Sequence, residues 1–180
     1  MTETATAATV WTIDPSHSSL EFAVKHMMFT TAKGRFSGVK GEITIDNQNI
    51  ANSRVEVEID AATVDTRDVK RDEHLKAADF FDVEKFPALT FTSTKVETAG
   101  GSALTVTGDL TIRDVTREVV LAAEFNGEGK NPWGQSVIGY SAATRIDRKD
   151  FGLNWNAALE TGGVLVSDDV KISLEIEATS

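Results

Sequence analysis

The chain has 180 residues, of which 41% are hydrophobic, enough for one filled core and too few for a second independent domain. Its 28 acidic residues outnumber its 18 basic residues, and the resulting formal charge of −10 repels the phosphates of nucleic acids and of anionic lipid surfaces. We therefore expect no nucleic-acid partner, and no apolar run reaches the roughly 18 residues of a transmembrane segment. The absence of cysteine excludes disulfides, thiolate catalysis and cysteine-based zinc sites.

The first residues of the chain do not resemble a secretory signal peptide. Residues 1–9 contain neither a basic cluster nor an apolar stretch. We therefore expect a cytoplasmic protein with a flexible tail over residues 1–9. No repeat, charge block or linker-like stretch divides the remainder, which predicts a single domain over residues 10–180.

Alternation of apolar and polar residues dominates the chain and predicts half-buried antiparallel strands. A short strand is expected first, over Val10–Asp14. The alternation then runs through residues 19–25, 54–59, 89–91, 104–112, 119–125 and 170–176. Two longer candidates carry internal glycines, namely Gly34–Asp46 with Gly38 and Gly41, and Gln135–Asp147 with Gly139.

The glycines and the number of strands together indicate a closed sheet. Glycine inside a strand is typical of a bend or bulge, as a strongly curved sheet requires. Counted from residue 19, the chain offers about eight strands, the number at which a barrel interior can hold one small ligand. The sequence therefore predicts an all-β fold, an extended antiparallel eight-stranded β-barrel.

One interval breaks the alternation and predicts a short inserted α-helix. Residues 68–78 lack Gly and Pro and follow the capping groups of Asp65 and Thr66. Arg67, Arg71 and His74 have helical spacing and would form a cationic stripe, either a solvated face or the surface of a lid beside a barrel mouth. A second irregular interval, residues 150–165, would cover the same end or the opposite one.

The three histidines lie in separate contexts and lack the spacing of a metal site, so we predict none. His17 follows a turn sequence and is expected to brace backbone groups. His26 continues the apolar face of a strand, either as a hydrogen-bonded core residue or as a polar group facing a ligand. Asp14, Ser16 and His17 are too close in sequence for a catalytic triad, and no Gly-x-Ser-x-Gly elbow or nucleotide-binding loop occurs. The sequence predicts no catalytic residues.

The hairpin after residue 24 mixes apolar and cationic side chains. Met27, Met28 and Phe29 lie between Lys25 and Arg35. Methionine adapts to irregular ligands and basic groups bind anionic oxygens, which suits a ligand with an apolar tail and an anionic head. The alternative is an ordinary hairpin tip with no ligand. Residues 145–151 also mix basic and aromatic side chains and allow the same two interpretations.

The ordered motifs of the chain resemble the YceI-like, polyisoprenoid-binding family, whose members are lipocalin-like in architecture. The resemblance covers nearly the whole chain and rests on residues 11–18, Phe22, His26, Gly34, Phe36, 41–46, Thr66, 71–75, 79–82, Phe86, Pro87, Phe91, 108–112 and 147–152. It implies a barrel with an inserted helix and a long apolar tunnel that binds isoprenoid chains, quinone tails or fatty amides without chemistry. Two departures are the lack of a signal peptide and of the lipocalin Gly-x-Trp motif, since Val10 precedes Trp11.

We therefore predict a non-enzymatic carrier or store of an apolar chain, with a bound polyisoprenoid or isoprenoid quinone as ligand and no cofactor. The residues expected to contact the tail are Leu20, Phe22, Val24, Met28, Phe29, Phe36, Val57, Phe80, Phe91, Val106, Leu121, Ile138, Tyr140, Phe151 and Trp155. Those expected to contact the head are Lys25, His26, Lys33, Arg35, Arg71 and His74. A filled barrel acting as a stress-response or interaction module, and an enzyme acting on a lipid-like substrate, are the alternatives. The protein could also form a homodimer, because some open-edged or helix-capped barrels associate in pairs.

Overall fold

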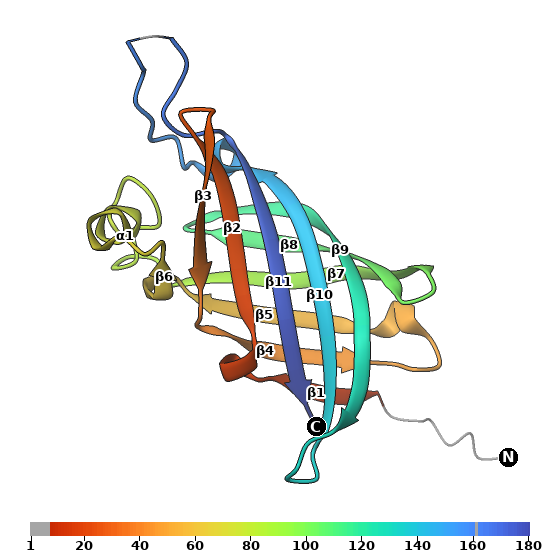
Figure 1. The fold of residues 1–180 in the computed structure, drawn as a ribbon. Coiled ribbons are helices and arrows are strands. Elements are labelled where there is room, and N and C mark those ends of the chain that lie inside the picture. The colour runs from red at the N-terminus through yellow and green to blue at the C-terminus, as the bar shows by residue number, and fades with distance from the viewer. Residues whose placement is uncertain (1–7, 161) are drawn as a thin grey trace, which may run out of the picture.

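The computed structural model describes residues 8–160 and 162–180, which form mostly β-structure (Figure 1). The strands are β1 (Thr9–Ile13), β2 (Ser19–His26), β3 (Thr30–Phe36), β4 (Val39–Ile45), β5 (Arg54–Asp60), β6 (Val64–Asp65), β7 (Ala88–Gly100), β8 (Ala103–Ile112), β9 (Val115–Lys130), β10 (Ser136–Asp147) and β11 (Asp169–Thr179). The helical elements are η1 (Pro15–His17), η2 (Ile50–Asn52), η3 (Ala61–Thr63), α1 (Val69–Lys76) and η4 (Arg148–Phe151). The predicted all-β fold is confirmed, and α1 lies inside the interval predicted to be helical.

The sheet closes into an eight-stranded antiparallel barrel. Its ring runs β1-β4-β5-β7-β8-β9-β10-β11, and β11 pairs back onto β1 through Thr12 opposite Thr179 and Ile13 opposite Ala178. The short first strand, expected as an addition to eight others, is therefore part of the ring. Of the tail predicted over residues 1–9, residues 1–7 lie outside the described residues, and Thr9 already belongs to β1.

Three of the barrel walls are long strands interrupted by a bend. Both β1 and β2 run antiparallel to β11, and the 3₁₀ turn η1 separates them. Pro15 stands at the start of η1, where its fixed φ is suited to the turn, and Asp14 caps it by accepting from the Ser16 backbone N–H. In the same way β3 continues into β4 and β5 into β6, so the eleven strands of the described chain make eight walls.

Glycines permit the curvature that closure needs, as the sequence predicts. Gly38 lies in the bend between β3 and β4, and the pairing of β10 with β9 shifts register at Gly139. Gly41 has a φ of +149°, and a Cβ there would lie 2.0 Å from the carbonyl oxygen of Glu56. Only glycine allows β4 to approach β5 this closely.

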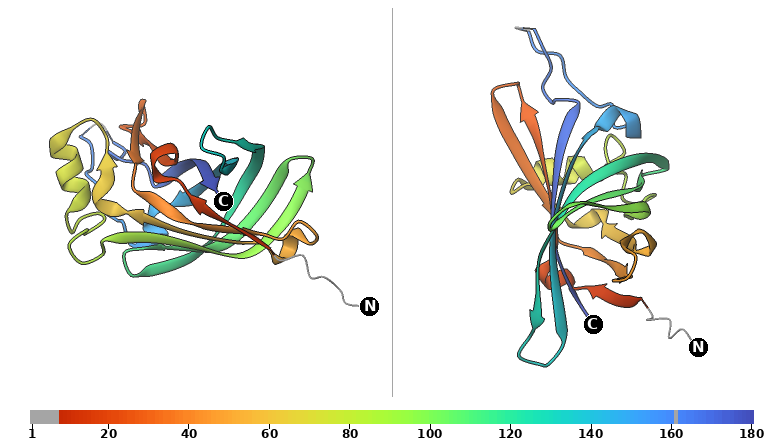
Figure 2. Two further views of the ribbon diagram at one scale, coloured as in Figure 1. Left: turned by 90° about the horizontal axis from the view of Figure 1, so that it is seen from below. Right: turned by 90° about the vertical axis from the view of Figure 1, so that its right-hand side faces the viewer.

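The helix α1 lies at one end of the barrel, beside β3 and β6 (Figures 1 and 2). Asp68 caps it by accepting a hydrogen bond from the Arg71 backbone N–H, and no residue of the helix is buried. The core instead lies inside the barrel, where Ile13, Phe36, Val39 and Ile59 are almost fully buried. Within residues 8–160 and 162–180, no helix is long and apolar enough to cross a membrane.

Candidate functional site

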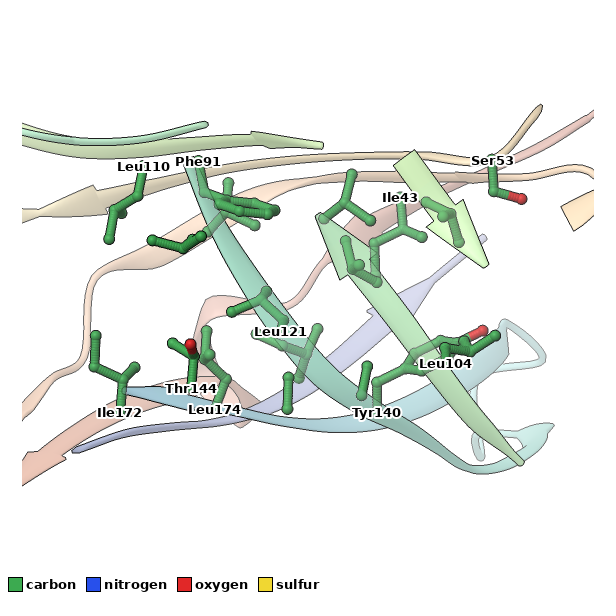
Figure 3. A pocket seen from close by; sticks show the side chains of 18 of the residues that line it. Ile43, Ser53, Phe91, Leu104, Leu110, Leu121, Tyr140, Thr144, Ile172 and Leu174 are labelled. Atoms are coloured by element: carbon green, nitrogen blue, oxygen red, sulfur yellow. The ribbon is translucent and has the colours of Figure 1, made fainter. Parts of the chain in front are cut away.

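An inner cavity of about 120 Å³ lies between the two halves of the barrel wall (Figure 3). Its lining is apolar except for three side chains with a hydroxyl group, and comprises Leu20, Ile43, Ile45, Ile50, Ser53, Val55, Val57, Ile59, Phe91, Val96, Leu104, Val106, Leu110, Val119, Leu121, Ala123, Tyr140, Ala142, Thr144, Ile172, Leu174 and Ile176. Burial raises the pKa of the Tyr140 hydroxyl, with a smaller contribution from the negative charge of Glu128. Such a surface offers an entering molecule little except dispersion contacts and removal from water.

A larger outer cavity of about 540 Å³ lies beneath α1 and beside the β2–β3 hairpin. This volume falls in the range of about 300–1,000 Å³ typical of small-molecule pockets. Its basic lining residues are Lys25, His26, Lys33, Lys70, Arg71, His74 and Arg148, whereas Asp68 is the one acidic residue among those that line it. The outer cavity therefore combines an apolar floor with a cationic rim, although the chain as a whole is acidic.

The two cavities share part of their walls. Leu20, Ile59, Leu110 and Ile172 line both, so the two cavities adjoin at these four side chains. The interior thus holds two adjoining apolar spaces, of which the outer one is wider and has a polar mouth; together we call them the tunnel. The structure confirms the expectation that the inward side chains of the barrel leave room between them.

Three rings cluster at this mouth. The His74 ring stands edge-on to Phe80 and to Trp155, with ring centroids 5.1 Å and 4.8 Å apart, and the Phe80 and Trp155 centroids are 5.5 Å apart. Asp79 fixes the His74 ring through a 2.9 Å contact between Oδ2 and Nε2. The helix, the loop after it and the segment following η4 therefore meet at one aromatic group.

Arg71 is held at the rim by the turn that precedes α1. Its Nε donates to the Thr66 hydroxyl and its Nη2 to the Thr66 carbonyl, both at 2.7 Å. Asp72 accepts from the Thr66 backbone N–H at 2.8 Å, which holds the turn in place. The guanidinium is thereby positioned before any ligand arrives, which reduces the entropy lost on binding.

Arg148 also lines the outer cavity, although it is not among the residues predicted to contact the head. Its side chain is almost fully buried and donates to the carbonyl oxygens of Leu153, Trp155, Val166 and Ser167 at 2.6–3.4 Å. Desolvation lowers the pKa of this guanidinium, and the charges of two nearby aspartates oppose the shift. A burial pattern cannot identify such a residue, because arginine is almost never fully buried unless it is paired.

Most predicted tail contacts lie on the tunnel, but five predicted site residues do not. The tail residues that line a cavity are Leu20, Phe22, Val24, Phe36, Val57, Phe80, Phe91, Val106, Leu121, Tyr140 and Trp155, and the head residues that do so are Lys25, His26, Lys33, Arg71 and His74. Met28 and Phe29 are instead 59% and 81% exposed, because the turn carries them beyond the barrel. Arg35 is exposed on β3 and lines neither cavity, since it alternates with the inward-facing Phe36.

Two further residues predicted to contact the tail also line neither cavity. Ile138 lies on the same face of β10 as Tyr140 but is packed in the core opposite Ala178, outside both cavities. Phe151 is 2% exposed, because η4 turns its ring into the core rather than towards a ligand. The alternation predicts which face of a strand is buried, but not how far along the barrel the void extends.

Asp14, Ser16, His17 and Glu177 form a polar cluster on the outside of the barrel. His17 Nδ1 lies 2.7 Å from Asp14 Oδ2 and 3.2 Å from the Ser16 hydroxyl. A catalytic triad uses opposite ring nitrogens for serine and aspartate, so a contact of both with Nδ1 does not match one. Asp14, His17 and Glu177 present ligand atoms within 4.8 Å of one another, and a cation would have to displace the Asp14–His17 contact.

The fold and the tunnel define a helix-capped antiparallel barrel with an apolar interior. A family model described as the YceI-like domain matches residues 11–178. A UPF0312 protein of Vibrio vulnificus is 41% identical over 138 residues, which cover 77% of this chain and 73% of that protein. The chain belongs to the YceI-like domain family.

Two solved structures illustrate the same architecture. The Campylobacter jejuni YCEI protein has a TM-score of 0.73 and 34% identity, and the match covers 87% of this chain and 89% of that one. A polyisoprenoid binding domain from Saccharophagus degradans has a TM-score of 0.68 and 16% identity, with 94% of this chain and 98% of that one covered. At this lower identity the second likeness concerns the fold alone.

Proposed function

We propose that this protein binds and carries an apolar chain ligand, with the tail in the inner cavity and the head group at the cationic mouth. The observation that carries the proposal is that the apolar inner cavity adjoins the basic outer cavity at Leu20, Ile59, Leu110 and Ile172. A tunnel that is apolar at its inner end and basic at its outer end fits a long molecule with one polar terminus.

The energetics favour a hydrocarbon tail of the isoprenoid or fatty type. Burial of one methylene contributes about 0.8 kcal/mol, so a chain that fills the tunnel needs few polar contacts for tight binding. The Saccharophagus degradans domain of similar fold is described as polyisoprenoid binding, which supports this class of ligand. A polyisoprenoid or an isoprenoid quinone is therefore our candidate.

The head group is proposed to interact with Lys25, Lys33, Arg71 and His74. Lys25 donates to the Thr31 hydroxyl at 3.0 Å, and Arg71 is fixed by Thr66, so both cations are already oriented beside the mouth. An anionic or strongly polar head would accept hydrogen bonds from these groups. His74 presents an aromatic edge as well as a polar nitrogen.

We propose binding without catalysis. The filled-barrel alternative is disfavoured by the inner and outer cavities, since Phe and Trp side chains leave the interior partly empty. An enzyme acting on a lipid would alter its ligand, so the same molecule should be recovered unchanged after prolonged incubation with the protein. Recovery of a chemically altered product would support the enzyme instead.

The first test is the content of the freshly purified protein. Native mass spectrometry should reveal a bound species, and solvent extraction followed by mass spectrometry should identify one apolar chain per barrel. Reversing the mouth charges with Lys33→Glu and Arg71→Glu should reduce retention of an anionic-headed lipid, whereas Arg35→Glu, at an exposed site off the cavities, serves as the control. A barrel that contains no lipid and takes none up from added isoprenoids would contradict the proposal.

A further inference from the structure

The tip of the β2–β3 hairpin exposes apolar side chains on a strained backbone. Met27 and Met28 have φ values of 52° and 63°, and the Phe29 backbone N–H donates to the His26 carbonyl at 3.1 Å, the pattern of a type I′ turn. Such turns favour Asn-Gly, because other residues are strained at positive φ. Stability alone therefore does not explain two methionines here, and the strain points to a function for their side chains.

This tip stands directly beside the mouth of the tunnel. Figure 1 and the right-hand view of Figure 2 show the β2–β3 hairpin and the segment after η4 projecting from the same end of the molecule. The two are joined by hydrogen bonds from the Met27 backbone N–H to the Leu165 carbonyl at 2.8 Å and from the Ser167 backbone N–H to the Lys25 carbonyl at 3.1 Å. Val164, 39% exposed, adds a third apolar side chain to Met28 and Phe29. We call these three residues the mouth prong.

Charge distinguishes the hairpin side of the prong from the rest of the surface, whereas the segment that carries Val164 has one exposed acidic residue, Glu160. Residues 25–33 contain Lys25, His26 and Lys33 and no acidic residue, in a chain whose formal charge is −10. Lys25 and Lys33 also line the outer cavity, so the positive charges lie behind the apolar tip, between it and the barrel. An apolar tip backed by lysines is the arrangement that suits a lipid interface, where the side chains enter the acyl region and the ammonium groups stay among the phosphates.

We propose that the mouth prong docks the protein on a phospholipid bilayer, so that the tunnel mouth faces the membrane. Among the described residues the prong offers three exposed apolar side chains, whereas a stable protein interface covers about 800 Å² per partner. The acidic remainder of the molecule is repelled by an anionic surface, which orients the prong towards it. The docking itself is independent of the proposed cargo, but the direction of cargo transfer rests on the proposed function.

The test uses flotation of the full chain with vesicles of phosphatidylcholine mixed with phosphatidylglycerol, and with vesicles of phosphatidylcholine alone. The triple variant Met27→Asn, Met28→Gly and Phe29→Thr removes the apolar tip and supplies the residues that a type I′ turn prefers, so it should fold at least as well. We expect its partition onto mixed vesicles to fall at least about tenfold, the loss of roughly one buried apolar side chain. Trp133→Ser is the matched control, because Trp133 is 82% exposed on the β9–β10 turn at the other end of the barrel.

Lys25→Gln with Lys33→Gln should abolish the preference for mixed over neutral vesicles, since these lysines supply the attraction to anionic phosphates. Three results would overturn the proposal: no flotation of the native chain with either vesicle, equal flotation of the triple variant, or loss of a dimer rather than of vesicle binding in that variant. The prong residues line neither cavity, so the triple variant should retain its extractable lipid. Lipid content and flotation thus report separately on the proposed cargo and on docking.

Discussion

His17 and Asp14 show how two exposed side chains stabilise the seam of the barrel. The hydrogen bond from His17, followed by that from Ser16, lowers the pKa of Asp14 to about 2. The same contact with Asp14, followed by the charge of Glu177, raises the pKa of His17. The cluster lies where β1 passes into β2 beside β11, and the Asp14 backbone N–H also donates to the Glu177 carbonyl at 2.8 Å. A local ion pair therefore reinforces barrel closure.

The sign of each shift fixes the pH dependence of this contribution. A lowered pKa means that ionised Asp14 favours the folded state, an effect lost as the pH falls from about 4 towards 2. A raised pKa means that protonated His17 favours the folded state, an effect complete below about pH 6.5 and lost as the pH rises through the raised value. The coupling is thus strongest in mildly acidic solution.

We predict that a double-mutant cycle of Asp14→Asn and His17→Gln shows a larger coupling at about pH 5 than at about pH 9. Asparagine retains the oxygen that caps η1, so the cycle isolates the charge. Urea denaturation at both pH values measures the free energy of unfolding of the four proteins. A coupling that is equal at the two pH values would show that the imidazolium charge makes no contribution.

At the scale of elements, the sequence predicts the strands well and their joining less well. Alternation places β2, β5, β8 and β11 nearly at their observed bounds, because each has one face inside the barrel. It misassigns η1 as a simple turn after an extra strand, because β1 pairs with β4 and closes the ring with β11, more than 160 residues away. Pairing between distant strands leaves no local pattern, so barrel closure had to be inferred from strand number and glycines.

The candidate site shows the same difference between residues on strands, which the sequence places well, and residues in turns, which it does not. Residues on alternating strands were predicted to face the ligand, and most do line the tunnel. The turn residues Met28 and Phe29 and the η4 residue Phe151 lie outside both cavities, because an apolar type alone does not tell a buried side chain from an exposed one outside regular structure. The alternation places Ala123 on the apolar face of its strand, but neither Ala123 nor Ala142, whose small size leaves space in the inner cavity, is among the residues predicted to contact the tail.

Arg148 holds the segment between η4 and β11, which forms one side of the mouth, through hydrogen bonds to its backbone carbonyls. We predict that Arg148→Lys, which keeps the charge but loses the planar fork, lowers the free energy of unfolding by about 3 kcal/mol, because several buried carbonyls lose their donor. Hydrogen exchange should increase in the segment that Arg148 holds. The exposed Arg145, paired with Asp169 at 2.7 Å, gives the matched control Arg145→Lys with a loss below about 1 kcal/mol. Equal losses in the two variants would contradict this role.

For the whole molecule, the proposed function assigns the two cavities to different parts of one ligand. Closure of the barrel removes the sheet edges and encloses the apolar inner cavity, while the bent ends of β3 and β5 make room for α1 and the basic outer cavity. A short chain can occupy the outer cavity alone, whereas a long chain must pass the four shared residues. Chain length should therefore determine which cavity contributes to affinity.

Ala142 provides the means to separate the two contributions. It lies opposite Ala123 on β9, and both line the inner cavity, so Ala142→Leu fills space that a long tail would use. Exclusion of two or three methylenes at about 0.8 kcal/mol each should weaken binding of long prenyl alcohols more than tenfold and leave short ones unaffected. Ala143→Leu, on the exposed face of the same strand, is the control. Titration calorimetry across a series of chain lengths measures the difference, and a loss that is uniform along the series would mean that tails do not reach the inner cavity.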